Sequence, residues 1–257
     1  MSWFGRWRRT RILGRHLIPL DAFEAAAARL TVLNGLSGDE LARLRESASL
    51  FLHDKTFSAA GGAEVDSATQ LAIALQACLL TLNLSEDSYH GWNEVILYPD
   101  EFLRRREEMD EAGVVHHSRD ILAGESWLGG PLVLSIADVN SSGPPDGFNV
   151  VLHEFAHKLD MLNGDANGFP PLHRGMDAAA WSHDFGSAYE DLRGRVDAGE
   201  DTAIDPYAST DPAEFFAVLT ELFFEIPGLV HAEYPAVYRQ LRQFYRQHPL
   251  SRLGHPA

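Results

Sequence analysis

The stretch Val150-Val151-Leu152-His153-Glu154-Phe155-Ala156-His157-Lys158-Leu159-Asp160 carries the strongest signal in the sequence. Its apolar residues recur at helical spacing, which predicts a helix over residues 149–162 with its apolar sides buried in the core. His153 and His157 are four residues apart, so they stack on one face of that helix, about one turn from each other. The pattern therefore predicts two neighbouring imidazoles on a rigid, buried helix.

Two imidazoles at this spacing can bind one tetrahedral zinc ion at the Zn–N distance of about 2.0–2.1 Å. Glu154 would then lie beside the metal, where it can take a proton from a zinc-bound water. The alternative is an exposed helix face without metal, but free histidines on so apolar a helix would be costly. Cys78 is the only cysteine, so a cysteine-based zinc site is excluded. One catalytic zinc per chain is the prediction.

A catalytic zinc needs a third protein ligand and an open position for water. One class of zinc peptidases supplies a histidine or aspartate six residues after the second histidine, with a glycine three residues earlier. Asn163 and Asp160 occupy those positions here, so this class is disfavoured. The alternative is a glutamate from a later helix, for which Glu214 and Glu221 are both candidates, seven residues apart and able to share a face.

The remaining histidines are not predicted to bind this metal. His116 and His117 are neighbours on a predicted strand over residues 114–118, so they point to opposite faces of a sheet. Four others have no ligand spacing and are expected at the surface or in loops: His173, His183, His231 and His248.

Periodicity and capping residues predict further helices over residues 39–51, 67–82, 212–224 and 235–247, and strands over 92–98 and 131–139. Ser37 and Asp211 are placed as N-caps, and Pro212 suits a first helical turn. Helices, then a few strands, then helices again favour a single α+β domain over residues 1–257. It is expected to be mostly helical, with a small mixed sheet beside the histidine helix.

Residues 1–20 are predicted to form a basic N-terminal arm, because Arg6, Arg8, Arg9, Arg11 and Arg15 alternate there with aromatic residues. Such an arm either touches a membrane surface or partner or is a frayed terminus, and the second is the preferred interpretation. No apolar run is long enough for a signal peptide or a membrane span. The net charge of −16 disfavours direct binding of nucleic acid. A single, buried Cys78 suits a reducing cytoplasm.

Two blocks of sequence resemble the Mlc titration factor A family of bacterial peptidases, namely residues 153–160 and 205–217. In shorter form they are also similar to the catalytic domain of anthrax lethal factor. In both, a tyrosine precedes the third zinc ligand by seven residues, as Tyr207 precedes Glu214. The resemblance extends through residues 70–83, 95–99 and 127–138, and therefore over most of the chain.

The resemblance implies a zincin-like fold with a gluzincin-like site, in which His153, His157 and Glu214 bind zinc. It implies that Glu154 is the general base and then the proton donor to the leaving amine. It implies that Tyr207 donates its hydroxyl to the oxyanion, a role that suits charge developing at the carbonyl. Glu221 is either a partner of a ligand histidine or a surface or capping carboxylate, with the latter preferred, and Asp160 has the same two options.

The leading functional hypothesis is a zinc-dependent peptidase acting on short peptides, in the manner of an aminopeptidase. An edge strand within residues 132–139 would pair with the extended substrate. The alternative hypothesis is a regulatory protein that sequesters a transcriptional repressor of the Mlc type, linked to sugar uptake, with peptidase activity secondary or absent. A purely structural zinc is a third option, which Glu154 and Tyr207 argue against because structural sites need neither.

Overall fold

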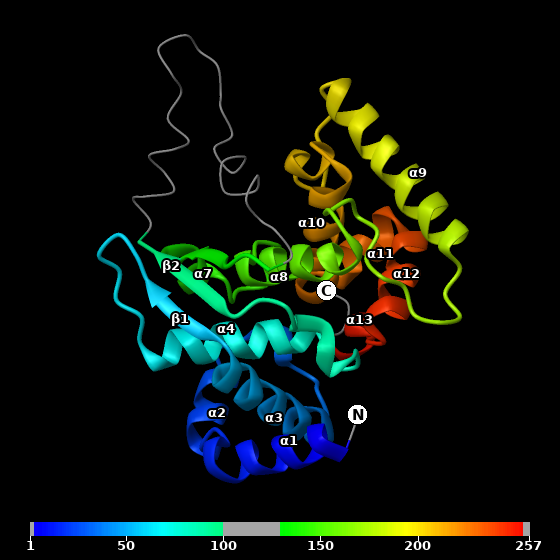
Figure 1. Cartoon of the computed structure of the whole chain (residues 1–257). Helices are drawn as coiled ribbons and strands as arrows, with labels where there is room; N and C mark the ends of the chain where they lie inside the picture. The colour runs from blue at the N-terminus through cyan, green and yellow to red at the C-terminus, as the bar shows by residue number, and fades with distance from the viewer. Residues whose placement is uncertain (1–2, 100–128, 254–257) are drawn as a thin grey trace.

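The computed structural model describes residues 3–99 and 129–253 (Figure 1). Helices dominate these residues: α1 (Trp3–His16), α2 (Leu20–Ala27), α3 (Gly38–Asp54), α4 (Ser67–Leu80), α7 (Ile136–Ser141), α8 (Val150–Asp160), α9 (Ala178–Asp197), α10 (Pro212–Glu225), α11 (Pro227–Glu233), α12 (Pro235–Tyr245) and α13 (Pro249–Leu253). Single 3-10 turns are η1 (Thr31–Leu33), η2 (Glu86–Tyr89), η3 (Met161–Asn163) and η4 (Pro206–Ser209). The predicted strand over residues 114–118, with His116 and His117, lies outside the described residues.

The described sheet has three strands in the order β1 (Thr56–Ala59), β2 (Glu94–Tyr98) and β3 (Leu132–Ser135). Both pairings are parallel, with Thr56 opposite Glu94 and Val95 opposite Leu132. Parallel neighbours require a crossover connection, and helix α4 lies on the connection between β1 and β2. The prediction of a mixed sheet is therefore wrong for the strands that the structure describes.

The four further helices expected from the sequence are present as α3, α4, α10 and α12. The side chain of Ser37 accepts a hydrogen bond from the Glu40 backbone, and the Glu40 side chain binds the Ser37 backbone in return. Asp211 caps α10 through the backbone N–H groups of Ala213 and Glu214. Because these caps are local, the helix starts could be predicted without knowledge of the packing.

Strand β3 is shorter than the strand predicted over residues 131–139. The hydroxyl of Ser135 accepts a hydrogen bond from the backbone N–H of Asp138, 3.2 Å away, and so caps a new helix, α7. An apolar run of this length fits a strand or a buried helix equally well, and the serine cap decides between them. The strand therefore ends four residues before the predicted end.

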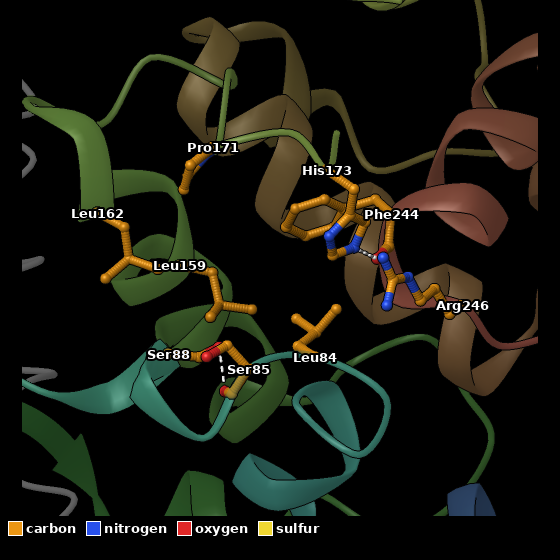
Figure 2. A pocket seen from close by; sticks show the side chains of 9 residues that line it. All are labelled: Leu84, Ser85, Ser88, Leu159, Leu162, Pro171, His173, Phe244 and Arg246. Carbon is orange, nitrogen blue, oxygen red and sulfur yellow. Dashed lines mark hydrogen bonds between the residues drawn. The ribbon is translucent and has the colours of Figure 1, made fainter. Parts of the chain in front are cut away.

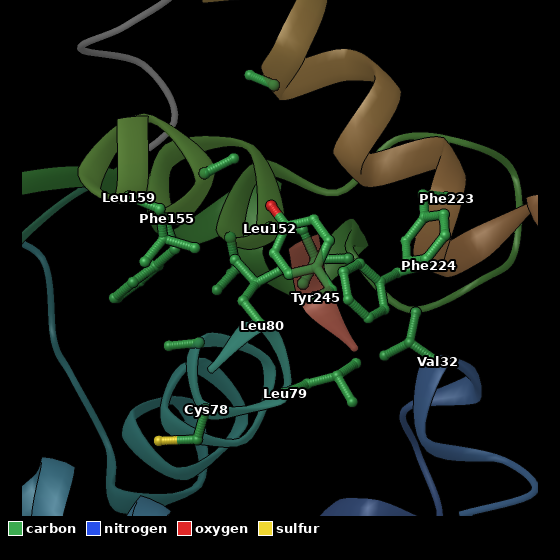
Figure 3. Close-up of a cluster of buried hydrophobic side chains, with 14 of the residues drawn as sticks. Val32, Cys78, Leu79, Leu80, Leu152, Phe155, Leu159, Phe223, Phe224 and Tyr245 are labelled. Atoms are coloured by element: carbon green, nitrogen blue, oxygen red, sulfur yellow. The ribbon is translucent and has the colours of Figure 1, made fainter. Parts of the chain in front are cut away.

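Helix α8 is the centre of the core and packs between α4 and α10 (Figure 3). The side chains expected to anchor it are all buried: Val150, Val151, Leu152, Phe155, Ala156 and Leu159. Cys78 on α4 is also buried, as predicted, and burial raises the pKa of its thiol. Lys158 ties α8 to the segment before β3, because its ammonium donates to the carbonyl of Gly130 at 3.0 Å. The sheet edge is thereby held beside α8.

Most residues of the predicted N-terminal arm form helix α1 and are not frayed. Ile12 is buried, and the guanidinium groups of Arg8 and Arg9 form ion pairs with Asp54 and Glu46 on α3. These contacts between segments distant in sequence hold the helix on the domain. Across the described residues, no helix combines the length and the apolar character needed to cross a lipid bilayer.

Candidate metal centre

Helices α8 and α10 bring together the three side chains that were predicted to bind zinc. One ligand atom from each of His153, His157 and Glu214 lies within 4.8 Å of the others. The Nε2 atoms of the two histidines are 3.2 Å apart, and Glu214 Oε2 lies 2.9 Å from Nε2 of His153 and 3.5 Å from Nε2 of His157. The three atoms therefore form a nearly equilateral triangle.

This triangle has the size of one face of a tetrahedral zinc site. With bonds of about 2.0–2.1 Å, neighbouring ligand atoms of a tetrahedron lie roughly 3.3–3.4 Å apart. Glu214 Oε2 is buried. Although it lies only 2.9 Å from Nε2 of His153, it has no hydrogen-bond partner among the described groups. An acceptor oxygen and two ring nitrogens this close together fit a cation, and two histidines with a carboxylate fit zinc.

Glu221 fixes the orientation of His153. Its Oε1 lies 2.6 Å from Nδ1 of His153, and its Oε2 accepts a hydrogen bond from the backbone of Asn149 at 2.7 Å. A carboxylate accepts the ring proton at Nδ1, which leaves Nε2 available to a metal. The preferred expectation was a surface or capping carboxylate, and the surface position is wrong, since Glu221 is only 4% exposed. The contact with His153, 68 residues away, agrees with the other option, a partner of one of the two motif histidines.

The carboxylates and imidazoles of the site shift one another's pKa values. Burial lowers the pKa of His153, but the carboxylates of Glu214 and Glu221 outweigh burial and raise this pKa to about 10. Burial likewise raises the pKa of Glu214, but the two histidines hold it well below its ordinary value. The site therefore stabilises a positive charge between the carboxylates, which a proton or a metal ion can provide.

Asp160 lies one turn after His157 and is fully buried. Its Oδ2 accepts hydrogen bonds from the backbone N–H groups of Asn167 and Gly168, both at 2.7 Å. Its Oδ1 and the Nδ1 atom of His157 are both buried and have no hydrogen-bond partner among the described residues. Asp160 thus anchors the loop after α8. Asn163, the ligand position of the disfavoured class, instead donates to the carbonyl of Phe169.

Glu154 and Tyr207 both lie near His153. Glu154 is half-buried and follows His153 directly on α8, and its charge acts on His153 and Lys158. The ring of Tyr207, in η4, lies with its centroid 6.3 Å from that of His153. Both residues with predicted catalytic roles therefore lie near His153, one of the three clustered side chains.

A buried polar network behind the site was not foreseen. Asn149 caps α8 and donates from its amide to Gln76 at 2.7 Å and to Glu225 at 2.8 Å. Burial raises the pKa of Glu225 to about 8, against the opposing hydrogen bonds from Asn149 and Gly147. The sequence contained one indication of this network. The only acidic residues of α10 are Glu214, Glu221 and Glu225, and their spacing puts them on one face of the helix.

The other described histidines do not join this cluster. His173 contacts the carbonyl of Phe244 at 2.6 Å, and His183 contacts the hydroxyl of Ser187 at 3.0 Å. His231 and His248 both pack near the ring of Tyr238. His183 and His231 are exposed, and His173 and His248 lie in loops, as expected from the sequence.

Figure 2 shows a separate cavity of about 420 Å³ on another side of α8. It is lined by Leu159 and Leu162 from the end of α8 and η3, and by His173, Phe244 and Arg246 among others. None of the three clustered side chains lines it. The candidate metal centre is therefore defined by converging side chains and not by this cavity.

A buried His-Glu-x-x-His helix with a converging glutamate defines a site of the metallopeptidase class. Comparison with known proteins gives the family. Residues 4–246 match the model of the glucose-regulated metallo-peptidase M90 family, and the chain belongs to this family. It is therefore a metallopeptidase.

Relatives called Mlc titration factor A are similar over most of their length. The protein of Salmonella arizonae is 43% identical over 232 residues, covering 88% of this chain and 91% of its own. That of Salmonella gallinarum is 44% identical, covering 88% and 86% respectively. That of Escherichia fergusonii is 41% identical over 229 residues, with the same coverage of 88% and 86%. The resemblance noted from the sequence motifs is thus confirmed.

Proposed function

We propose that the chain is a zinc-dependent peptidase in which His153, His157 and Glu214 bind one zinc ion. The observation that carries this proposal is the triangle of ligand atoms, with sides of 2.9, 3.2 and 3.5 Å. The whole chain from residue 1 to 257 would form one metallopeptidase domain around this centre. Zinc at this position would act as a Lewis acid toward water and toward the scissile carbonyl.

The side chains around the metal position would supply the proton transfers. Glu154 would take a proton from the attacking water and deliver it to the leaving amine. The hydroxyl of Tyr207 would donate a hydrogen bond to the oxyanion of the tetrahedral intermediate, where negative charge develops. Glu221 would hold the imidazole of His153 in the orientation that exposes Nε2.

The substrate would be a short peptide bound along β3 and cleaved near its amino end. Among the described strands β3 is at the edge of the sheet, and strand addition binds an extended peptide through main-chain hydrogen bonds. The preference for the amino end rests on the resemblance in sequence. An amino-acid anilide assayed beside its N-acetylated form tests it, because an aminopeptidase cleaves only the free amine.

Replacement of Glu154 by glutamine tests the proposed chemistry. Glu154→Gln should keep about one zinc per chain, because Glu154 is not a proposed ligand, and should lower kcat by at least about 100-fold. Zinc content by mass spectrometry and peptide hydrolysis measure the two effects. Glu190→Gln, an exposed carboxylate on α9, is the matched control and should change neither. Loss of zinc in Glu154→Gln, or retention of activity, would contradict these roles.

A second function is suggested by the name of the relatives, Mlc titration factor A. We propose that this chain also binds a transcriptional repressor of the Mlc type, through a surface separate from the metal centre. A pull-down of that repressor by wild-type protein and by His153→Ala separates the functions. Binding that survives the loss of zinc supports a separate surface, whereas binding lost together with zinc would place the repressor at the active site.

A further inference from the structure

Exposed apolar side chains gather at one end of the molecule. Six large hydrophobic residues are exposed in the described part of the chain, and five of them fall between residues 3 and 20: Trp3, Phe4, Trp7, Leu17 and Leu20. Trp3 and Phe4 are each 70% exposed, and Trp7 is 50% exposed. Side chains of this size are seldom clustered on the surface of a soluble domain unless the cluster binds something.

The three aromatic residues share the outward face of α1. At 100° per residue, Trp3, Phe4 and Trp7 fall within an arc of about 100°, and Ile12 lies on the far side of the helix. Ile12 is buried, so the arc faces away from the domain. Arg11 lies within the same arc, with its guanidinium 5.4 Å from the centre of the Trp7 ring. The outward face is therefore both aromatic and cationic.

Charge distinguishes this end from the rest of the protein. Residues 1–20 contain five arginines and no acidic residue, whereas the whole chain has a net charge of −16, so the other 237 residues carry −21. Arg8 and Arg9 pair with acidic residues of α3. Arg6, Arg11 and Arg15 are exposed and form no ion pair within residues 3–99 and 129–253. These three are available to an anionic partner.

We propose that this outward face of α1 binds the surface of an anionic lipid bilayer. Tryptophan and phenylalanine beside arginine are the combination that partitions into the interface, where the rings enter the headgroup region and the guanidinium groups meet phosphate. In Figure 1, α1 lies at one end of the molecule, with α3 between it and the sheet.

Vesicle flotation tests the proposal with the full-length, zinc-loaded protein. Wild type should float with vesicles of equal parts phosphatidylglycerol and phosphatidylcholine and should not float with phosphatidylcholine alone. Removing Arg6, Arg11 and Arg15 together, as R6Q/R11Q/R15Q, should lower the partition coefficient roughly 100-fold, at about fivefold for each arginine near the surface. W3A/F4A/W7A should lower it at least as much, because interfacial binding also scales with buried apolar area.

Matched controls keep this test specific. R174Q/R239Q/R242Q removes three exposed arginines elsewhere, and Phe148→Ala removes the sixth exposed hydrophobic residue. Both should float like wild type, and all variants should keep wild-type zinc content and peptide hydrolysis. Absence of flotation, equal flotation with neutral vesicles, or equal loss in the controls would overturn the proposal. So would a dimer in sedimentation that W3A/F4A/W7A dissociates while wild type fails to float, since the face would then bind a second copy.

Discussion

At the scale of single residues, His153 is held from both sides of its ring. Glu221 contacts Nδ1 at 2.6 Å, and Nε2 faces Glu214 at 2.9 Å. The same Glu221 carboxylate binds the backbone of Asn149, the N-cap of α8. One side chain thus orients the ring and fixes the start of the helix that carries it, which gives the ligand a rigid position.

Replacing Glu221 should therefore weaken the metal site without removing a ligand. A glutamine has one acceptor oxygen, so Glu221→Gln can satisfy His153 or the Asn149 backbone but not both. The affinity for zinc should fall about 10- to 100-fold, the usual effect of losing a carboxylate partner of a ligand histidine. Competition with a chromogenic chelator measures it, with Glu190→Gln as control. An affinity equal to that of wild type would show that Glu221 only fills space.

The raised pKa of His153 predicts how zinc binding depends on pH. The metal-free site keeps a proton on His153 until the pH approaches about 10, and zinc must displace that proton. The apparent affinity should fall about tenfold for each pH unit below that value, with close to one proton released per zinc.

The stability of the metal-free protein should depend on pH in the opposite direction. The stability from this histidine is complete below its ordinary pKa of 6.5 and is lost as the pH rises toward about 10.

Titration calorimetry in buffers of different ionisation enthalpy measures the released protons directly. Zinc uptake at neutral pH without proton release would contradict the charge state assigned to His153. The Glu221→Gln variant should release a smaller fraction of a proton, because it lacks one of the two carboxylates that raise this pKa.

At the scale of elements, a short loop couples the two helices of the metal centre. Asp160 at the end of α8 binds the backbone of Asn167 and Gly168. Gly168 in turn packs against the backbone of Pro212, the first residue of α10 and two positions before Glu214. The indole of Trp181 donates to the Gly168 carbonyl at 3.0 Å and fixes the loop from a third side. The loop therefore links the helices that carry the proposed ligands, α8 and α10.

A methyl group at Gly168 should disturb this link. Gly168 has φ of +75°, and a Cβ there would lie within 3 Å of the Pro212 carbonyl oxygen. Gly168→Ala should lower the free energy of unfolding by about 2–5 kcal/mol, through left-handed strain and overpacking together. It should also weaken zinc binding, because relief of the clash displaces the start of α10. Thermal unfolding and chelator competition measure the two effects.

Gly175→Ala is the matched control, because Gly175 has φ of +103° but open space where a Cβ would lie. It should cost only the backbone strain, about 1–2 kcal/mol, and leave zinc affinity unchanged. Equal zinc affinities for the two variants would show that the loop does not position α10.

Elements with local signals could be predicted from the sequence, whereas a short strand without such a signal and the exact end of another could not. The capped starts of α3 and α10 follow from Ser37, Asp211 and Pro212, which act on their own helix. Strand β1 was missed because it has four residues and depends on β2, for example through the Ser58 hydroxyl bound to Glu94. The predicted end of β3 was four residues too late, because the side chain of Ser135 caps a helix within the apolar run that was interpreted as a strand.

At the scale of the whole molecule, the candidate site joins segments that are far apart in the chain. Helices α8 and α10 pack against each other in the core although α9 and η4 lie between them in sequence. The motif on α8 predicts two neighbouring histidines, and spacing alone left Glu214 and Glu221 open as the third ligand. Packing distinguishes them, because Glu214 faces both Nε2 atoms whereas Glu221 faces Nδ1 of His153.

The distribution of charge and apolar surface also belongs to this scale. The metal centre lies on the core helices α8 and α10, and the aromatic, arginine-rich face lies on α1 at one end of the molecule (Figure 1). The net charge of −16 disfavours binding of nucleic acid, an anionic partner, but this value averages over regions of opposite sign. On α1 the fold gathers exposed arginines and exposed aromatic residues at one end of the molecule.

The central claim is a zinc ion held by His153, His157 and Glu214. A crystal structure of the zinc-loaded protein, with anomalous scattering measured at the zinc edge, tests it most directly. The account predicts one peak per chain, about 2.0–2.2 Å from Nε2 of each histidine and from a Glu214 carboxylate oxygen, with a coordination position left open. A peak elsewhere, or a Glu214 carboxylate more than about 3 Å from the metal, would contradict it.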